Sequence, residues 1–199
     1  MKLFYSPGAC SLSPHIVSRE LGLSPQLVKV DGKTHTFDGA DYYAVNPKGS
    51  VPALQLDGGD VLTEGAVIVQ YLADQKPESN LAPKAGTMDR YRLQEWLNFI
   101  ATDVHKQLSP LFNPLVNAEA KASVRARLET RLAVAAKTLD THEYLMGHFT
   151  VADAYLFTVL RWAPRLEVDL AKWPSLTAFM ARMRTRAAVK AALTAEGLE

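Results

Sequence analysis

The pattern of secondary-structure signals changes once along the chain, and this change constrains the fold more than any other feature. Residues 1–75 alternate short apolar runs with helix-like segments, whereas no strand pattern remains after Met88. The segment between them, residues 76–87, has the proline, serine, asparagine and glycine content of a linker. We therefore predict a mixed domain over residues 1–77, a linker over 78–87 and an all-helical domain over 88–199.

The first domain has the order strand, helix, strand, then strand, strand, helix. The first half is typical of a parallel crossover, and Asp57-Gly58-Gly59-Asp60 in the second half is a hairpin signal. Together they predict an α/β domain with a mixed sheet. The expected strands are residues 2–5, 26–30, 53–56 and 61–63, and the expected helices are residues 14–21 and 65–74.

The second domain shows apolar residues at helical spacing only. Residues 91–107 follow this spacing, and residues 151–163 are apolar on nearly every face, as in the central helix of a bundle. Thr150 and Asp153 form a capping box in front of this helix, to which we assign a structural role. An outer helix is indicated by one apolar stripe, made of Val124, Leu128, Leu132, Ala135 and Leu139.

Composition excludes several classes of protein. The formal net charge is +1 without a basic stripe, which argues against nucleic acid as a partner. One cysteine cannot form an internal disulfide and fits a reducing compartment. The N-terminal apolar run is too short for a signal peptide, and no run reaches the roughly 18 residues of a membrane span. We expect a cytoplasmic protein without a metal site, since the histidines show no ligand spacing.

The single cysteine, Cys10, lies at a predicted junction between a strand and a helix. Ser13 and Pro14 read as the N-cap and first residue of that helix. Unpaired amides and the positive end of the helix dipole favour the reactive thiolate there. The alternative is an inert, buried cysteine that behaves as a small apolar residue.

Two further patterns each allow a functional and a structural interpretation. Pro52 starts a strand after Val51, so this bond is either a cis-proline, whose preceding backbone can pair with an extended peptide, or an ordinary edge proline. Asn98, Thr102 and His105 recur at spacings of four and three, which places them on one face of an α-helix. Such a polar stripe needs a partner, either a ligand or other polar groups of the protein.

The order of these motifs over essentially the whole chain resembles the cytosolic glutathione transferases, and most closely the bacterial beta class. The matching segments are residues 5–13 (YSPGACSLS), 46–54 (NPKGSVPAL), 62–65 (LTEG), 68–72 (IVQYL), 95–106 (EWLNFIATDVHK), 149–155 (FTVADAY) and 195–198 (AEGL). The resemblance implies a thioredoxin-like N-terminal domain, an all-helical C-terminal domain, a homodimer, and glutathione as co-substrate without a metal.

The resemblance also implies how the first domain binds glutathione. Val51, before Pro52, would pair its backbone with the cysteinyl unit. Glu64 and the amides of Gly65 and Ala66 would hold the γ-glutamyl end, since a carboxylate is favoured at a helix N-terminus. Many relatives have serine after this acid, and glycine here removes that hydroxyl.

One lysine in the first domain stands where the beta class holds the glycyl carboxylate of glutathione. This residue is Lys33, in a loop that departs from the usual pattern and looks shortened. His35 could take the role instead, and a merely solvated lysine is a third reading.

In the second domain the resemblance places His105 near the sulfur with Lys106 beside it. Asn98 and Thr102 would reach glutathione, partly across a dimer interface. The candidates for an apolar electrophile pocket are Phe112 and Trp162, although aromatic residues in helices are by default core residues.

Cys10 occupies the position at which beta-class members have a cysteine that can form a mixed disulfide with glutathione. Tyr5 and Ser11 are hydroxyl alternatives nearby. Ser13 stands where a dithiol protein has its second cysteine, so a redox cycle would need glutathione as the resolving thiol.

Three functions follow from these residues. The main prediction is a transferase that conjugates glutathione to small hydrophobic electrophiles in detoxification, with Cys10 and His105 as catalytic residues. The alternative is a glutathione-dependent thiol-disulfide reductase or dehalogenase that works through a Cys10 mixed disulfide. A non-catalytic ligand-binding or regulatory protein is the third, and the presence of the glutathione-holding residues disfavours it.

Overall fold

The computed structural model describes residues 1–198 and divides into two compact units. The first unit combines Met1–Ala82 with the chain from Thr185 onward, and the second is Pro83–Arg184. Their boundary lies inside the predicted linker. The predicted helical domain runs further than the second unit, because α8 (Ala187–Ala195) packs against α1 (Leu12–Glu20) of the first unit.

A four-stranded mixed sheet forms the first unit. Its strands are β1 (Lys2–Tyr5), β2 (Gln26–Lys29), β5 (Ala53–Gln55) and β6 (Val61–Thr63), in the order β2-β1-β5-β6. Strands β1 and β2 are parallel, whereas β1 pairs with β5 and β5 with β6 in antiparallel fashion. The mixed sheet and the hairpin are therefore confirmed.

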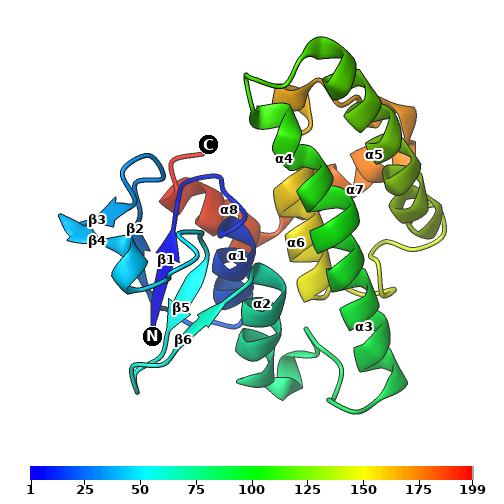
Figure 1. Cartoon of the computed structure of the whole chain (residues 1–199). Coiled ribbons are helices and arrows are strands. Elements are labelled where there is room, and N and C mark those ends of the chain that lie inside the picture. The colour runs from blue at the N-terminus through cyan, green and yellow to red at the C-terminus, as the bar shows by residue number, and fades with distance from the viewer. Residues whose placement is uncertain (199) are drawn as a thin grey trace. The chain divides into compact units, whose positions relative to one another are not determined.

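Helices α1, α2 (Gly65–Asp74) and α8 lie on one side of this sheet, with α1 between the other two (Figure 1). Helix α2 has the predicted bounds. Helix α1 begins earlier than predicted, because its N-cap is Ser11 rather than Ser13. Pro14 is thus the third helical residue, where its missing N–H removes no bond, since the first four amides of a helix lack intrahelical partners.

Two short elements of the first unit were not predicted. They are the hairpin of β3 (Thr36–Phe37) and β4 (Ala40–Asp41), followed by the 3-10 turn η1 (Tyr42–Ala44). Strands of two residues are too short to show a period. The turn matters for the site, because Tyr42 is fully buried in a cluster with Phe4 and Val28. A further 3-10 turn, η2 (Pro77–Ser79), follows α2.

Within the described residues, helices joined by loops make up the second unit, and it contains no strand. Its α-helices are α3 (Met88–Phe99), α4 (Lys106–Phe112), α5 (Ala118–Leu139), α6 (Val151–Leu160) and α7 (Pro174–Thr185), with 3-10 turns η4 (Pro164–Leu166) and η5 (Leu170–Lys172). Every residue of α6 is buried, which confirms a central helix. The predicted apolar stripe of α5 is buried as well.

The capping box in front of α6 is confirmed. The Asp153 carboxylate accepts hydrogen bonds from the Thr150 N–H at 2.8 Å, from the Thr150 hydroxyl at 3.1 Å and from the Leu145 N–H at 2.9 Å. Burial raises the pKa of this carboxyl to about 6. Its contacts join the start of α6 to the preceding loop, which agrees with a structural role.

The predicted helix over residues 91–107 is interrupted by a π-helical segment, η3 (Ile100–His105), between α3 and α4. The Lys106 N–H donates to the Ala101 carbonyl, five residues back. Two local features favour this wider turn. Pro110 cannot donate to the Lys106 carbonyl, and the Thr102 hydroxyl donates to the Asn98 carbonyl at 3.0 Å, a bond that bends helices.

Candidate functional site

The loop that leads into β5 is held by buried polar groups of the first unit. The Asn46 side-chain amide is buried and donates to the Ser50 carbonyl at 2.7 Å, and the Tyr42 hydroxyl donates to the same carbonyl at 2.9 Å. Gly49 has φ +67°, and a Cβ there would lie 2.7 Å from the Tyr43 ring. The loop therefore requires a glycine and presents its last residues in one conformation.

The Val51–Pro52 peptide bond at the end of this loop is cis. Of the two interpretations that the sequence left open, the cis-proline is therefore the one that the structure has. The Val51 carbonyl accepts a hydrogen bond from the Cys10 thiol at 3.2 Å. Within residues 1–198, no acceptor bonds the Val51 N–H. The structure thus brings Cys10, Val51 and Pro52 together and leaves one backbone donor for an extended peptide.

The surroundings of Cys10 favour the protonated thiol over the thiolate, two states that the sequence leaves open. Burial, with a smaller contribution from the Glu64 charge, raises the pKa of Cys10 to about 11, although the amides of Cys10 and Ser11 lower it. Two amides do not offset the loss of water around the sulfur. The helix N-terminus favours a thiolate at Cys10, whereas burial opposes it and has the larger effect on the pKa.

The start of α2 lies beside this loop. Gly65 is close enough to Pro52 that a Cβ would meet its ring at 3.7 Å, and the Ser13 hydroxyl lies at a similar distance. The Val67 and Ile68 amides bond the Glu64 carbonyl. In the described part of the chain, the two amides before them, those of Gly65 and Ala66, make no hydrogen bond. This pair of free N–H groups at a helix N-terminus suits a carboxylate.

Glu64 stands just before these amides with φ 69°, a left-handed conformation that is uncommon for a residue with a side chain. Its carboxylate accepts from the Lys48 ammonium at 2.6 Å, and the same ammonium donates to the Thr63 hydroxyl at 3.0 Å. Lys48 was missed at the sequence level. The sequence feature that could have indicated Lys48 is its position in the segment 46–54, four residues before Pro52.

The loop after β2 distinguishes the two candidates for the glycyl carboxylate. The His35 ring bonds the Gly49 carbonyl at 3.2 Å and lies 4.8 Å from the Tyr43 ring, so it supports the loop before β5. Lys33 is exposed beside an open surface hollow of about 570 Å³ that Lys29 and Phe37 also line. Lys33 thus stays the better candidate.

Tyr5 is half-buried at the end of β1, with its ring 6.4 Å from that of His15. Burial raises the pKa of its hydroxyl, and the Glu196 charge raises it further. Tyr5 is consequently a neutral phenol, able to donate a hydrogen bond.

In the second unit, three predicted residues come together. The His105 ring lies 5.1 Å from the Trp162 ring, and the Phe112 ring packs edge-on against Trp162 at 5.5 Å. The Arg165 guanidinium lies 5.8 Å from the centre of the Phe112 ring. Burial lowers the pKa of His105, and the Lys106 charge lowers it further, so the imidazole is neutral at pH 7.

Sequence reasoning missed Tyr155, whose hydroxyl lies 2.7 Å from His105 Nδ1. Tyr155 is only 4% exposed, on the fully buried helix α6. A phenol hydroxyl inside an otherwise apolar helix needs a polar partner, and this was the available signal.

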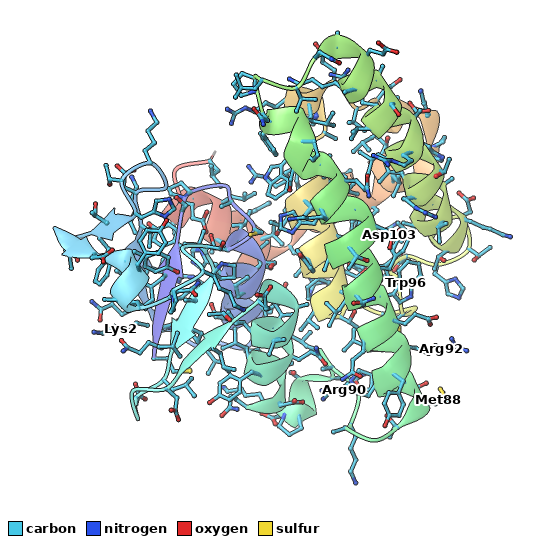
Figure 2. The ribbon with its side chains drawn as sticks, viewed as in Figure 1. Lys2, Met88, Arg90, Arg92, Trp96 and Asp103 are labelled. Atoms are coloured by element: carbon cyan, nitrogen blue, oxygen red, sulfur yellow. The ribbon has the colours of Figure 1, made fainter. Side chains whose placement is uncertain are left out.

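Asn98 and Thr102 are not brought into contact with the His105 side chain by any described hydrogen bond. The Thr102 hydroxyl instead bonds the Asn98 carbonyl and, at 2.9 Å, the carboxylate of Asp103, which Figure 2 labels. That carboxylate pairs with Arg131 of α5 at 3.1 Å. The spacing of four and three marks one face only in an α-helix, and η3 changes that register.

Comparison with known proteins agrees with this geometry. Family models of the glutathione S-transferase N-terminal and C-terminal domains match residues 8–75 and 99–187. The chain is 51% identical to glutathione S-transferase GstA of Escherichia coli O157:H7 over 100% of both chains.

The chain belongs to the glutathione S-transferase family.

Solved structures place this transferase beside beta-class enzymes. It is similar to BphK, a bacterial glutathione transferase solved as a ternary complex, with TM-score 0.98, 55% identity and full coverage of both chains. It is also similar to the beta-class enzyme of Sphingomonas chungbukensis and to a sphingomonad enzyme complexed with glutathione, each with TM-score 0.96, 46% identity and full coverage of both chains. The thioredoxin-like first unit and helical second unit are those of the family.

The transferase is thus an enzyme that conjugates glutathione, and its full-length relatives do not favour the reductase, dehalogenase or non-catalytic alternatives. Among residues 1–198, no helix is both long and apolar enough to cross a membrane. In the same residues, no three His, Cys, Asp or Glu side chains gather as metal ligands would.

Proposed function

We propose that the first unit binds glutathione as an extended peptide along the cis-proline loop. The observation that carries this proposal is the open Val51 N–H beside the Cys10 thiol, next to the two free amides of α2. The cysteinyl unit pairs with Val51, and the γ-glutamyl carboxylate takes the amides of Gly65 and Ala66.

The charged ends of glutathione find charged partners in the same unit. Glu64 binds the γ-glutamyl ammonium in competition with Lys48, and this competition is weak because both side chains are more than half exposed. Lys33 binds the glycyl carboxylate, and Tyr5 donates a hydrogen bond through its neutral hydroxyl. Each role uses a group whose charge or proton fits glutathione.

The second unit supplies the groups for the electrophile. The Phe112 side chain is 42% exposed and, with Trp162, offers an aromatic surface to a small hydrophobic electrophile. His105 acts as a hydrogen-bond donor in the transfer step. Asn98, Thr102 and Lys106 are the further proposed glutathione contacts, and their exposure leaves them available for it.

In the reaction, the thiol of glutathione gives its proton to solvent and its sulfur forms a bond to the electrophilic carbon. In a substitution the carbon–halogen bond breaks and halide leaves, whereas in a Michael addition the carbanion takes up a proton. Cys10 remains a thiol, and its S–H assists as a weak donor to the reacting sulfur once it turns away from the Val51 carbonyl. Its pKa of about 11 opposes a mechanism that needs a Cys10 thiolate.

We further propose a cytoplasmic homodimer that serves detoxification. Support for the dimer comes from α3, on which Met88 is 68% and Tyr91 57% exposed (Figure 2 labels Met88). Apolar side chains so exposed on one helix suit a protein interface. Light scattering of the purified chain gives the mass, and a monomer across micromolar concentrations would contradict the dimer.

The deciding experiment measures conjugation of glutathione to 1-chloro-2,4-dinitrobenzene by wild type, Cys10→Ala and His105→Ala, with glutathione affinity by calorimetry. We expect Cys10→Ala to retain conjugation within about threefold, since the reacting sulfur belongs to the substrate, and His105→Ala to lose about tenfold or more in kcat. Complete loss in Cys10→Ala, with glutathione still bound, would favour the mixed-disulfide alternative.

A further inference from the structure

The hydrogen bond between Tyr155 and His105 joins two elements that are far apart in the sequence. His105 is the last residue of η3, and Tyr155 lies in the middle of α6. The bond is short, at 2.7 Å, and the two rings meet nearly at right angles, at 87°. The π-helical turn changes the direction in which residue 105 leaves its helix, and π-helical turns often occur at functional sites.

A neutral imidazole carries its proton on one of two nitrogens, and the partner of one nitrogen selects the tautomer. The partner of His105 Nδ1 is a phenol hydroxyl, which donates readily to an unprotonated ring nitrogen. When Nδ1 accepts, the proton of the neutral ring lies on Nε2. The Nε2–H group is then a donor that needs no proton from solvent before each turnover.

The surroundings of the ring keep it neutral. The Trp162 ring, in the turn that follows α6, lies 5.1 Å from the His105 ring. The charged group that acts on His105 is the Lys106 ammonium, which opposes protonation and lowers the pKa of the imidazole. The nearby carboxylate of Asp103 already pairs with Arg131 and accepts from Thr102. Arg165, over the Phe112 ring, adds a second positive charge to this cluster.

We propose that Tyr155 is a positioning residue, whose hydroxyl donates to His105 Nδ1 and thereby holds the imidazole in the tautomer that carries its proton on Nε2. The inference rests on the proposed function of His105 as a donor in the transfer step. Tyr155 touches neither substrate in this role and acts only through the histidine.

The test compares Tyr155→Phe, which removes one oxygen and keeps the ring, with wild type. The control is Thr158→Val, which removes another buried hydroxyl of α6, one that bonds only the Ala154 carbonyl of its own helix at 2.8 Å among the described contacts. Nitrogen-15 NMR of the histidine side chains reports which ring nitrogen carries the proton, and the His105→Ala spectrum assigns the signal of residue 105.

We expect Tyr155→Phe to convert the His105 signal from a single Nε2–H tautomer to a mixture of tautomers. We also expect kcat for conjugation to fall about three- to tenfold, with KM for glutathione unchanged. Thr158→Val should change neither quantity. In the His105→Ala background the Tyr155→Phe substitution should have no further effect on kcat, because its effect passes through the histidine.

The remaining outcomes separate the two proposals. Wild-type conjugation by His105→Ala would overturn the role of His105 in the proposed function and this inference with it. If His105→Ala has impaired conjugation but Tyr155→Phe leaves the His105 tautomer unchanged, only the inference is overturned and the proposed function stands. An equal loss of kcat from Tyr155→Phe in both backgrounds would show a merely structural role and would also overturn the inference.

Discussion

The candidate sites of the two units consist of different chemical groups. The first unit offers backbone groups, namely the Val51 peptide and the first amides of α2, with Cys10 and Glu64 beside them. The second unit offers only side chains, contributed by η3, α4 and the region of α6. Backbone groups suit a co-substrate that is itself a peptide, whereas aromatic side chains suit an electrophile recognised by apolar area.

The difference has a consequence for which mutations matter. Backbone donors cannot be removed by changing a side chain, so glutathione binding by the first unit should be sensitive mainly at Glu64, the one carboxylate of its candidate site. The second unit should respond at several positions, each by a moderate amount.

The largest effect is expected from Glu64→Gln. The substitution removes the negative charge proposed to bind the γ-glutamyl ammonium and preserves the size of the side chain. The glutamine oxygen can still accept a hydrogen bond, but the attraction between opposite charges is lost, so the Kd for glutathione should rise about 10- to 100-fold. Isothermal titration calorimetry with glutathione measures this change directly.

The matched control is Glu78→Gln, which removes one exposed carboxylate of the same unit, from η2. Its Kd should equal that of wild type. A rise of equal size in both variants would trace the effect to the total charge, and an unchanged Kd in Glu64→Gln would contradict the proposed γ-glutamyl site.

The same contrast explains how much of the molecule the sequence could predict. The Val51–Pro52 site depends on seven consecutive residues, in which Asn46 and Gly49 set the turn, so a local motif contains most of the information. The bounds of α2 were predicted for the same reason, since its start follows directly from the hairpin and Gly65.

The features that escaped prediction depend on contacts between distant segments. Tyr155 meets His105 across 50 positions, and α8 joins the first unit by packing on α1. The choice between thiol and thiolate at Cys10, which the sequence leaves open, depends on burial and on the charge of Glu64. The π-helical segment η3 also escaped prediction, because an analysis of periodicity assumes α-helical spacing. Pro110, five residues after η3, was not enough to predict it.

A moderate effect is expected from Trp162→Leu in the second unit. Loss of the indole removes aromatic surface beside Phe112 and His105, so KM for 1-chloro-2,4-dinitrobenzene should rise about tenfold while KM for glutathione stays the same. The control is Trp173→Leu, another half-buried tryptophan of this unit, beside η5. An equal rise in KM for glutathione would contradict the proposal that the first unit binds glutathione and the second binds the electrophile.

The smallest effect on conjugation is expected at Cys10, and here the pH dependence sharpens the comparison. A thiol with a pKa of about 11 is almost wholly protonated at pH 7, and raising the pH converts it to the reactive thiolate. The rate of alkylation by iodoacetamide should therefore increase about tenfold per pH unit from pH 7 to pH 10 without a plateau. Mass spectrometry reads the rate without ambiguity, since Cys10 is the only cysteine of the chain. A plateau of the alkylation rate near pH 7 would mean that the first unit stabilises the Cys10 thiolate. The first unit would then supply a side-chain nucleophile, and not only backbone groups that bind glutathione.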